Sequence, residues 1–293
     1  DSDDVNGESS SYLEEVKLLE LLNKPDTVRG LPRCKSVLEL YAHEVSPADG
    51  YLYIVMEMGD MDMAQMLTRR SKRREKVDLN FVRHHWGMMV ECVREIHERL
   101  VIHADLKPAN FLVTKGELKL IDFGIAKSAN ADTTKVDFSN QVGTLNYMSP
   151  EALGGTLGTF YKGAEVPGES AAAMRLNRKT DVWSLGCILY LMVYMRTPFQ
   201  DLSTAAKMRK IPDPLTRVKY PQIRRGKCPL DADALVDMEW DAIPVSERND
   251  YEPLGFVIPA MQNCLTHSPV DRFDVMELLN MPFLRPDKLA WRR

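Results

Sequence analysis

The segment VIHADLKPANFLVTKGELKLIDFG, residues 101–124, is the most informative part of this chain. Its apolar and β-branched runs, separated by turn residues at Lys115-Gly116, predict short strands joined by a tight turn. The connection between Asn110 and Asp122 is short, so the hairpin folds these two residues back toward each other. Pro108 stiffens the loop that presents them. The segment therefore predicts a loop and a hairpin that bring polar side chains together.

The polar side chains of this segment suit phosphoryl transfer to a hydroxyl group. Such a reaction needs a carboxylate that orients the nucleophile and takes up its proton, oxygen ligands for Mg²⁺, and a cation near the transferred group. Asp105 supplies the carboxylate, Lys107 the cation, and Asn110 with Asp122 the oxygen ligands. His103 is interpreted as a buried histidine that bonds to backbone, because Asp105 already fills the role of the base.

The composition excludes several classes of protein. The chain has 293 residues, of which 44% are hydrophobic and 27% charged, and these values exclude disordered, collagen-like and coiled-coil chains. Its length allows one large domain or two lobes with a sizeable core. A formal net charge of −4 gives no whole-molecule attraction to nucleic acid or to an anionic membrane, so neither partner is expected.

The cysteines and the apolar stretches indicate a reduced compartment and no membrane span. The 5 cysteines form no CxxC pair, which predicts free thiols, as in the cytosol or nucleus. The longest apolar stretch, Val182–Val193, is shorter than the roughly 20 residues that cross a bilayer, so it predicts a buried helix. The polar lead DSDDVNGESSS has no initiator Met and no signal-peptide pattern, and we expect it to lie inside a longer chain.

The surrounding patterns predict a small mixed lobe followed by a larger helical lobe, which is the α+β class. A capping box of Ser11 and Glu14 begins a first helix near residue 11. Residues 36–45 and 51–57 read as an antiparallel hairpin. Apolar residues at helical spacing predict helices over 82–100, with Asn80 as N-cap, and over 181–194 and 254–265.

These patterns divide the chain into three parts. Residues 1–58 form a partial small lobe, residues 59–285 the large lobe, and residues 286–293 a tail. Two stretches without periodicity, at about 154–177 and 225–253, are predicted as surface insertions. The second is acidic and is expected to be a solvated loop.

Several ordered motifs resemble the eukaryotic protein kinase signature. They are HADLKPANFL (103–112), DFG (122–124), SPE (149–151), DVWSLG (181–186) and Arg272. The resemblance implies a bilobal protein-kinase-like fold in which Asp181 begins the buried central helix and Arg272 pairs with Glu151. Over about residues 12–284 the chain is most similar to the monopolar spindle (TTK) dual-specificity kinases, through LKLIDFGIAK, DTTKV, QVGTLNYMSPEAL, TDVWSLGCILY and TPFQ.

This resemblance implies an ATP and Mg²⁺ site. Glu15 would pair with the ATP-positioning lysine of the active state. Adenine would be held by the gatekeeper Met56, the hinge residues Glu57, Met58 and Gly59, and Leu112 beneath it. Leu19, Leu40, His103 and Phe123 match a hydrophobic column of the family, although ordinary packing explains them equally well. Gly124 completes the DFG motif after the metal ligand Asp122.

The activation segment runs from Asp122 to Glu151 and contains four candidate phosphorylation sites. These are Thr133, Thr134, Ser139 and Thr144, where a phosphate would add about −1.5 to −2 charge. Ala104 occupies the position where many kinases have the arginine that binds such a phosphate. The monopolar spindle kinases also lack it, and Lys127 or Lys135 could serve instead.

No glycine-rich loop and no lysine of the VAIK type precede Tyr12, which leaves three hypotheses open. The first is a kinase for Ser/Thr, and also Tyr, of protein substrates at the spindle or kinetochore, in the nucleus and cytoplasm, compatible with a dimer through trans-autophosphorylation. The second is a catalytically impaired pseudokinase scaffold that binds partners through the acidic insertion and the basic run Arg69–Lys76. A small-molecule phosphotransferase is the third, and the SPE and DVWS motifs disfavour it because they resemble peptide-substrate machinery.

Overall fold

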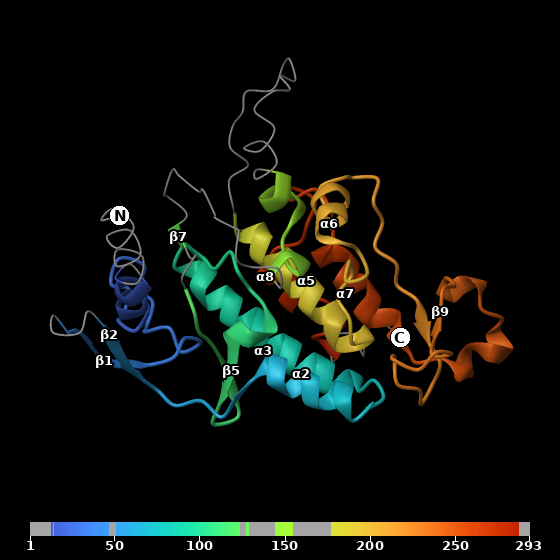
Figure 1. Cartoon of the computed structure of the whole chain (residues 1–293), viewed down its shortest axis with the longest axis horizontal. Helices are drawn as coiled ribbons and strands as arrows, with labels where there is room; N and C mark the ends of the chain where they lie inside the picture. Colours follow the sequence, from blue (N-terminus) through green and yellow to red (C-terminus); the bar gives the residue numbers. More distant parts are fainter. Residues whose placement is uncertain are drawn as a thin grey trace, which may run out of the picture.

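The computed structural model describes residues 13, 15–46, 51–123, 127–128, 144–154 and 177–286. Within these residues the chain forms a small mixed lobe followed by a larger, mainly helical lobe, as the predicted α+β bilobal class requires. Figure 1 shows the small lobe, in blue, at one end of the long axis of the molecule. None of the helices in the described part is long and apolar enough to cross a membrane.

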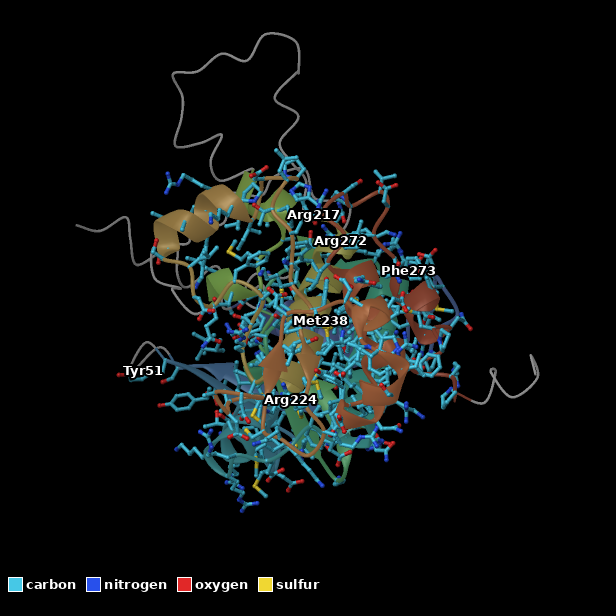
Figure 2. All side chains as sticks on the ribbon, turned by 90° about the vertical axis from the view of Figure 1, so that its right-hand side faces the viewer. Tyr51, Arg217, Arg224, Met238, Arg272 and Phe273 are labelled. Carbon is cyan, nitrogen blue, oxygen red and sulfur yellow. The ribbon has the colours of Figure 1, made fainter. Side chains whose placement is uncertain are left out.

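In the described residues, the small lobe contains one helix and one hairpin. Residues 15–22 are helical, with Val16, Leu19 and Leu22 buried, while the predicted capping box at residues 11 and 14 lies outside the described residues. The hairpin pairs β1 (Leu40–Val45) with β2 (Leu52–Met56) in antiparallel fashion, which confirms the predicted strands. Much of this hairpin is exposed, and Figure 2 shows Tyr51 at its outer end, at the edge of the molecule.

The two lobes meet at a three-stranded sheet of β3 (Met61–Asp62), β5 (Phe111–Thr114) and β6 (Glu117–Leu120). The turn between β5 and β6 falls at Lys115-Gly116, as predicted, and both residues have positive φ. Strand β4 (Val101–Ile102) pairs with β7 (Lys127–Ser128). The predicted hairpin between Asn110 and Asp122 is therefore present. It places the loop at residues 103–110, which we call the catalytic loop, beside the sheet.

Two helices follow the hinge between the lobes. Helix α2 (Met63–Lys72) is capped by Asp62, whose side chain accepts a hydrogen bond from the Gln65 N–H at 2.8 Å. Helix α3 (Leu79–Glu98) confirms the predicted period, but its N-cap is Asp78 and not Asn80. The expected cap was wrong because Asp and Asn both favour this position, and here it is Asp78 that accepts bonds from the first backbone N–H groups.

The core of the large lobe forms around α5 (Arg178–Tyr194), which is buried on nearly every side. Helix α3 packs against both α5 and α8 (Val275–Leu279), and α7 (Val257–Cys264) packs against α5. These helices confirm the predictions for 181–194 and 254–265. Helix α6 (Thr204–Lys210) is the remaining α-helix of the described C-terminal part. All five cysteines are buried and free, as expected.

The acidic insertion is exposed over most of its length, as expected for a solvated loop, but it also contains short regular structure that the sequence did not predict. We call residues 222–253 the outgrowth; it contains β8 (Gln222–Ile223) paired with β9 (Leu235–Val236) and short 3-10 turns, and Figure 1 shows it in orange, at the opposite end of the molecule from β1 and β2. Ile243 and Tyr251 are buried in it. Arg74 of the basic run binds Asp231 at 2.6 Å. Most of the other predicted insertion, residues 155–176, lies outside the described residues.

Candidate active site

The loop after β4 is held by the carboxylate of Asp181, in the first turn of α5. Asp181 Oδ2 accepts hydrogen bonds from the backbone N–H of His103 at 3.0 Å and from Nε2 of His97 at 2.7 Å, and Oδ1 accepts one from the Ala104 N–H at 2.8 Å. Ala104 has φ 66°, a left-handed conformation that is strained for a residue with a Cβ. Asp181 thus stabilises a backbone turn that alanine alone does not favour.

This turn presents Asp105 together with Lys107. The Asp105 Oδ2 accepts a hydrogen bond from Lys107 Nζ at 2.6 Å, while Oδ1 is buried and has no hydrogen-bond partner among the described residues. A buried carboxylate oxygen without a donor is costly. Asp105 Oδ1 can therefore accept a proton or a hydrogen bond from a substrate group. The predicted base and cation are in direct contact.

Asn110 and Asp122 are brought together by the backbone. Asn110 ends the 3-10 turn Pro108–Asn110, and its carbonyl accepts a hydrogen bond from the Ile121 N–H at 2.9 Å, one residue before Asp122. The Asn110 Oδ1 is buried without a hydrogen-bond partner in the described part of the chain. An amide oxygen beside a carboxylate fits a divalent cation such as Mg²⁺, which is usually held by one or two protein carboxylates together with substrate phosphates. The described residues hold no cluster of three His, Cys, Asp or Glu that would bind a metal by itself.

His103 and Phe123 pack behind this cluster. Their ring centroids are 5.1 Å apart, and both side chains are buried. Burial lowers the pKa of His103, so the ring stays neutral and its Nε2 lies 3.4 Å from the Ile121 carbonyl. His103 is thus the backbone-bonded core histidine that the sequence predicted. Leu19 is buried nearby in the same core, and Leu40 packs against that core.

Glu15 reaches the same cluster from the small lobe. Its Oε1 accepts a hydrogen bond from the Phe123 N–H at 3.0 Å. Burial and the charge of Asp122 raise the pKa of Glu15, against the lowering effect of the Phe123 N–H. The helix at residues 15–22 is therefore tied directly to the segment that carries Asp122.

The predicted adenine-binding residues lie where the two lobes join. Met56 ends β2, and the Glu57 N–H donates to the Glu39 carbonyl at 2.8 Å. Gly59 lies directly against Leu112: a Cβ added to Gly59 would be 2.0 Å from Leu112 Cδ2. Met58 is exposed. Of the three hinge residues, Gly59 is thus in contact with Leu112 of β5.

The end of the activation segment is fixed by a buried ion pair. Arg272 donates to both carboxylate oxygens of Glu151, at 2.7 and 3.1 Å, and both side chains are almost fully buried. This is the contact that the resemblance implied. Thr144 is buried in a 3-10 turn, whereas Thr133, Thr134, Ser139, Gly124 and Lys135 lie outside the described residues, as does the side chain of Lys127.

Two residues of the site were not expected from the sequence. His97 supports Asp181 from α3, and Lys119 binds the carboxylate of Glu57 at the hinge. Lys119 could have been found, because the turn at Lys115-Gly116 sets the register of the hairpin and places it opposite Leu112. His97 has no comparable signal, since its partner is 84 residues away in the sequence.

Comparison with known proteins agrees with this geometry. The family model described as protein kinase domain matches residues 1–284. The fission yeast (Schizosaccharomyces pombe) serine/threonine-protein kinase mph1 is 37% identical over 275 residues, which cover 94% of this chain and 36% of that protein. The zebrafish (Danio rerio) dual specificity protein kinase Ttk is 34% identical over 250 residues, or 85% of this chain and 21% of that protein. The mouse (Mus musculus) dual specificity protein kinase TTK is 32% identical over 276 residues, or 94% and 26%.

The chain thus spans between about a fifth and about a third of the length of these relatives. The family match covers both lobes, including the catalytic loop, the DFG segment and the Glu151–Arg272 pair. Proteins of this family are enzymes that use ATP and divalent metal ions to phosphorylate protein substrates. On this match and this geometry, the chain belongs to the protein kinase family.

Proposed function

We propose that this chain phosphorylates serine and threonine, and also tyrosine, in proteins of the mitotic spindle checkpoint and of chromosome segregation, with Mg²⁺ as its divalent ion. The proposal rests on its likeness to serine/threonine and dual specificity kinases and on the monopolar spindle motifs of its sequence. The proposal also places the protein in the nucleus and cytoplasm, and at the kinetochore. It further includes a dimer that forms during trans-autophosphorylation.

The observation that carries the proposal is a pair of buried oxygens. Asp105 Oδ1 and Asn110 Oδ1 have no hydrogen-bond partner among the described residues, on a loop that Asp181 fixes. Each unpaired oxygen costs about 1–3 kcal/mol. A chain that had lost catalysis would have no physical reason to keep both. A bound substrate hydroxyl would supply the missing partner of Asp105 Oδ1, and a bound metal ion would supply that of Asn110 Oδ1.

Each residue of the site would have a distinct part in the transfer. Asp105 would orient the attacking hydroxyl and accept its proton on Oδ1, while Lys107, at 2.6 Å from Oδ2, would offset charge on the transferred group. Asn110 and Asp122 would hold Mg²⁺. The ion supplies charge neutralisation on the phosphates of ATP when bound. Glu15, through the Phe123 N–H, would keep the Asp122 segment in place.

The exposed face of the small lobe supports a kinase that is completed by more polypeptide. Tyr53 and Val55 of β2 and Tyr41 of β1 are each more than half exposed. A two-stranded sheet is marginal by itself, and unpaired apolar strands are an aggregation hazard. Further strands that carry the glycine-rich loop and lysine would pair with this hairpin and complete the sheet of the small lobe. Reading the gene upstream of Asp1 tests this directly, and a start codon immediately before Asp1 would contradict it.

The scaffold hypothesis loses part of its support. It relied on the acidic insertion and the basic run Arg69–Lys76 as two separate binding surfaces. In the structure they contact each other through Arg74 and Asp231, and Arg74 also donates to the Leu230 carbonyl at 3.1 Å. Arg70 is held by Glu75 at 3.0 Å and lies over the ring of Phe81. Arg70 and Arg74 of the basic run are thus paired with carboxylates within the molecule.

The test of the proposed function compares phosphate transfer by the purified full chain and by two variants, with labelled ATP, Mg²⁺ and a generic acceptor protein. Asp105→Asn keeps the shape of the side chain but cannot accept the proton, so we expect transfer to fall by about 100-fold or more. The control Asp78→Asn makes the same chemical change at a helix cap where Asn serves equally well. The pseudokinase scaffold hypothesis would be favoured if the unaltered chain and Asp105→Asn transferred phosphate equally. It would also be favoured if the unaltered chain transferred no phosphate.

A further inference from the structure

The β5–β6 hairpin contacts the hinge through two side chains that lie opposite each other. Leu112 of β5 and Lys119 of β6 are cross-strand partners, so their side chains are on the same face of the hairpin. Leu112 lies against Gly59, and Lys119 Nζ binds Glu57 Oε2. One face of the hairpin therefore holds the hinge at two places, one apolar and one ionic.

The ionic contact is buried. The side chain of Glu57 is 7% exposed and that of Lys119 is 16% exposed. The hydrogen bond from Lys119 holds the pKa of Glu57 below its ordinary value, so the carboxylate is ionised. A buried carboxylate without a cation is strongly unfavourable. Lys115 also approaches Glu57, at 3.5 Å, but its side chain is 84% exposed and cannot replace a buried partner.

The backbone on both sides of this contact is fixed as well. The Glu57 N–H bonds to the Glu39 carbonyl at 2.8 Å, and the Asp60 N–H bonds to the Val113 carbonyl at 2.7 Å. Between these bonds, Met58 is 87% exposed and gives no anchor. The hinge backbone is thus fixed at two points, and the contact of the Glu57 side chain with Lys119 is the side-chain contact that adds to them and holds the hinge beside Leu112.

We propose that Lys119 is a positioning residue for the adenine of ATP: by holding Glu57, it sets the distance of the hinge backbone from Leu112. The inference rests on the proposed function, in which the hinge backbone binds adenine and Leu112 lies beneath the ring. Lys119 itself contacts Glu57 and not the phosphate-transfer residues Asp105, Asn110 and Asp122. Its loss therefore weakens nucleotide binding and leaves the chemical step largely intact.

The test uses adenosine as probe, because adenosine has no phosphates and so measures the adenine site alone. Calorimetric titration of the full chain and of Lys119→Met gives the affinities, and kinetics with ATP give KM and kcat. We expect Lys119→Met to weaken adenosine and to raise the KM for ATP about tenfold, with kcat within about twofold. The control Lys115→Met removes the same charge at the exposed partner, and we expect less than about a twofold change.

Two further variants separate positioning from general stability. Lys119→Arg keeps a cation and should restore most of the affinity for adenosine. Glu57→Gln with Lys119→Met should bind no worse than Lys119→Met alone, because the unpaired buried charge is then gone. A Lys119→Met protein that melts earlier but binds adenosine normally overturns the inference, as does a wild-type chain that binds no adenosine. Adenosine binding without phosphate transfer would instead refute the proposed function and leave this inference standing.

Discussion

At Gly59 the hinge backbone lies so close to β5 that no side chain fits. A Cβ there would be 2.0 Å from Leu112 Cδ2 and 2.2 Å from Leu112 Cγ, so either Leu112 or the hinge must move. Overpacking of this kind costs about 1–3 kcal/mol. We predict that Gly59→Ala lowers the free energy of unfolding by that amount and weakens adenosine binding, as measured by urea unfolding and titration.

The control for this residue is Gly255, where nothing lies within 4 Å of an added Cβ. We expect Gly255→Ala to change neither stability nor adenosine affinity. Adding Leu112→Ala to Gly59→Ala removes the clash and should recover part of the lost stability. A Gly59→Ala protein as stable as Gly255→Ala would show that the hinge is not pressed against β5.

Among the elements, α5 carries the carboxylate that shapes the catalytic loop. Burial raises the pKa of Asp181, but the hydrogen bonds that its carboxylate accepts from His97 Nε2 and from the His103 N–H lower it more, so its pKa lies below the ordinary value. Stability from this group is fully present above the unfolded pKa of about 3.9 and is lost as pH falls through the folded pKa. We predict that Asp181→Asn costs about 3 kcal/mol at pH 7 and that this difference narrows below about pH 4.

Urea unfolding of the two proteins at pH 7 and at about pH 3 measures this difference. The matched control is Asp237→Asn, an exposed carboxylate that binds Lys219 on the surface of the outgrowth. Exposed pairs contribute about 0–1 kcal/mol, so the control should behave like the wild type. An Asp181→Asn penalty of the same size at both pH values would contradict the assignment.

Elements with a regular period were predictable from local patterns, whereas the long-range contact of Glu151 with Arg272 was expected only from the family resemblance, and other long-range contacts were not expected at all. Helix α3 follows from six apolar residues at helical spacing, and the β5–β6 turn follows from Lys115-Gly116. The order of motifs brought Asp105, Lys107, Asn110 and Asp122 into one hypothesis, and the structure gathers them on adjoining segments. The fold of the outgrowth depends on contacts such as Arg74 with Asp231, which are 157 residues apart. No local pattern encodes such a pair.

In the whole molecule, the segment that follows the first helix is attached to the large lobe. Glu95 of α3 accepts hydrogen bonds from the N–H groups of Lys35 at 2.9 Å and Ser36 at 3.2 Å, and from the Cys34 thiol at 3.2 Å. Burial raises the pKa of Cys34 to about 12, so the thiol is protonated and can donate. The Leu120 N–H bonds to the Ser36 carbonyl at 2.7 Å. The first helix, which precedes this segment, and β1, which follows it, are therefore joined by a segment fixed to α3 and β6.

Removal of this attachment should loosen the small lobe alone. In Glu95→Ala the backbone N–H groups of Lys35 and Ser36 lose their acceptor, so we predict faster hydrogen exchange at these amides and in the helix at residues 15–22, with α5 unchanged. Glu98→Ala is the control on the same helix, because Glu98 binds Arg94 at the surface. Faster exchange in α5 as well would mean that Glu95 supports the whole fold. Unchanged exchange in the first helix would mean that the other contacts, such as the hinge and the Glu15–Phe123 hydrogen bond, hold the lobes together without Glu95. The predicted pattern requires that the small lobe opens as a unit once the segment at Glu95 is released, while the hinge at Glu57 and the hydrogen bond between Glu15 and Phe123 remain.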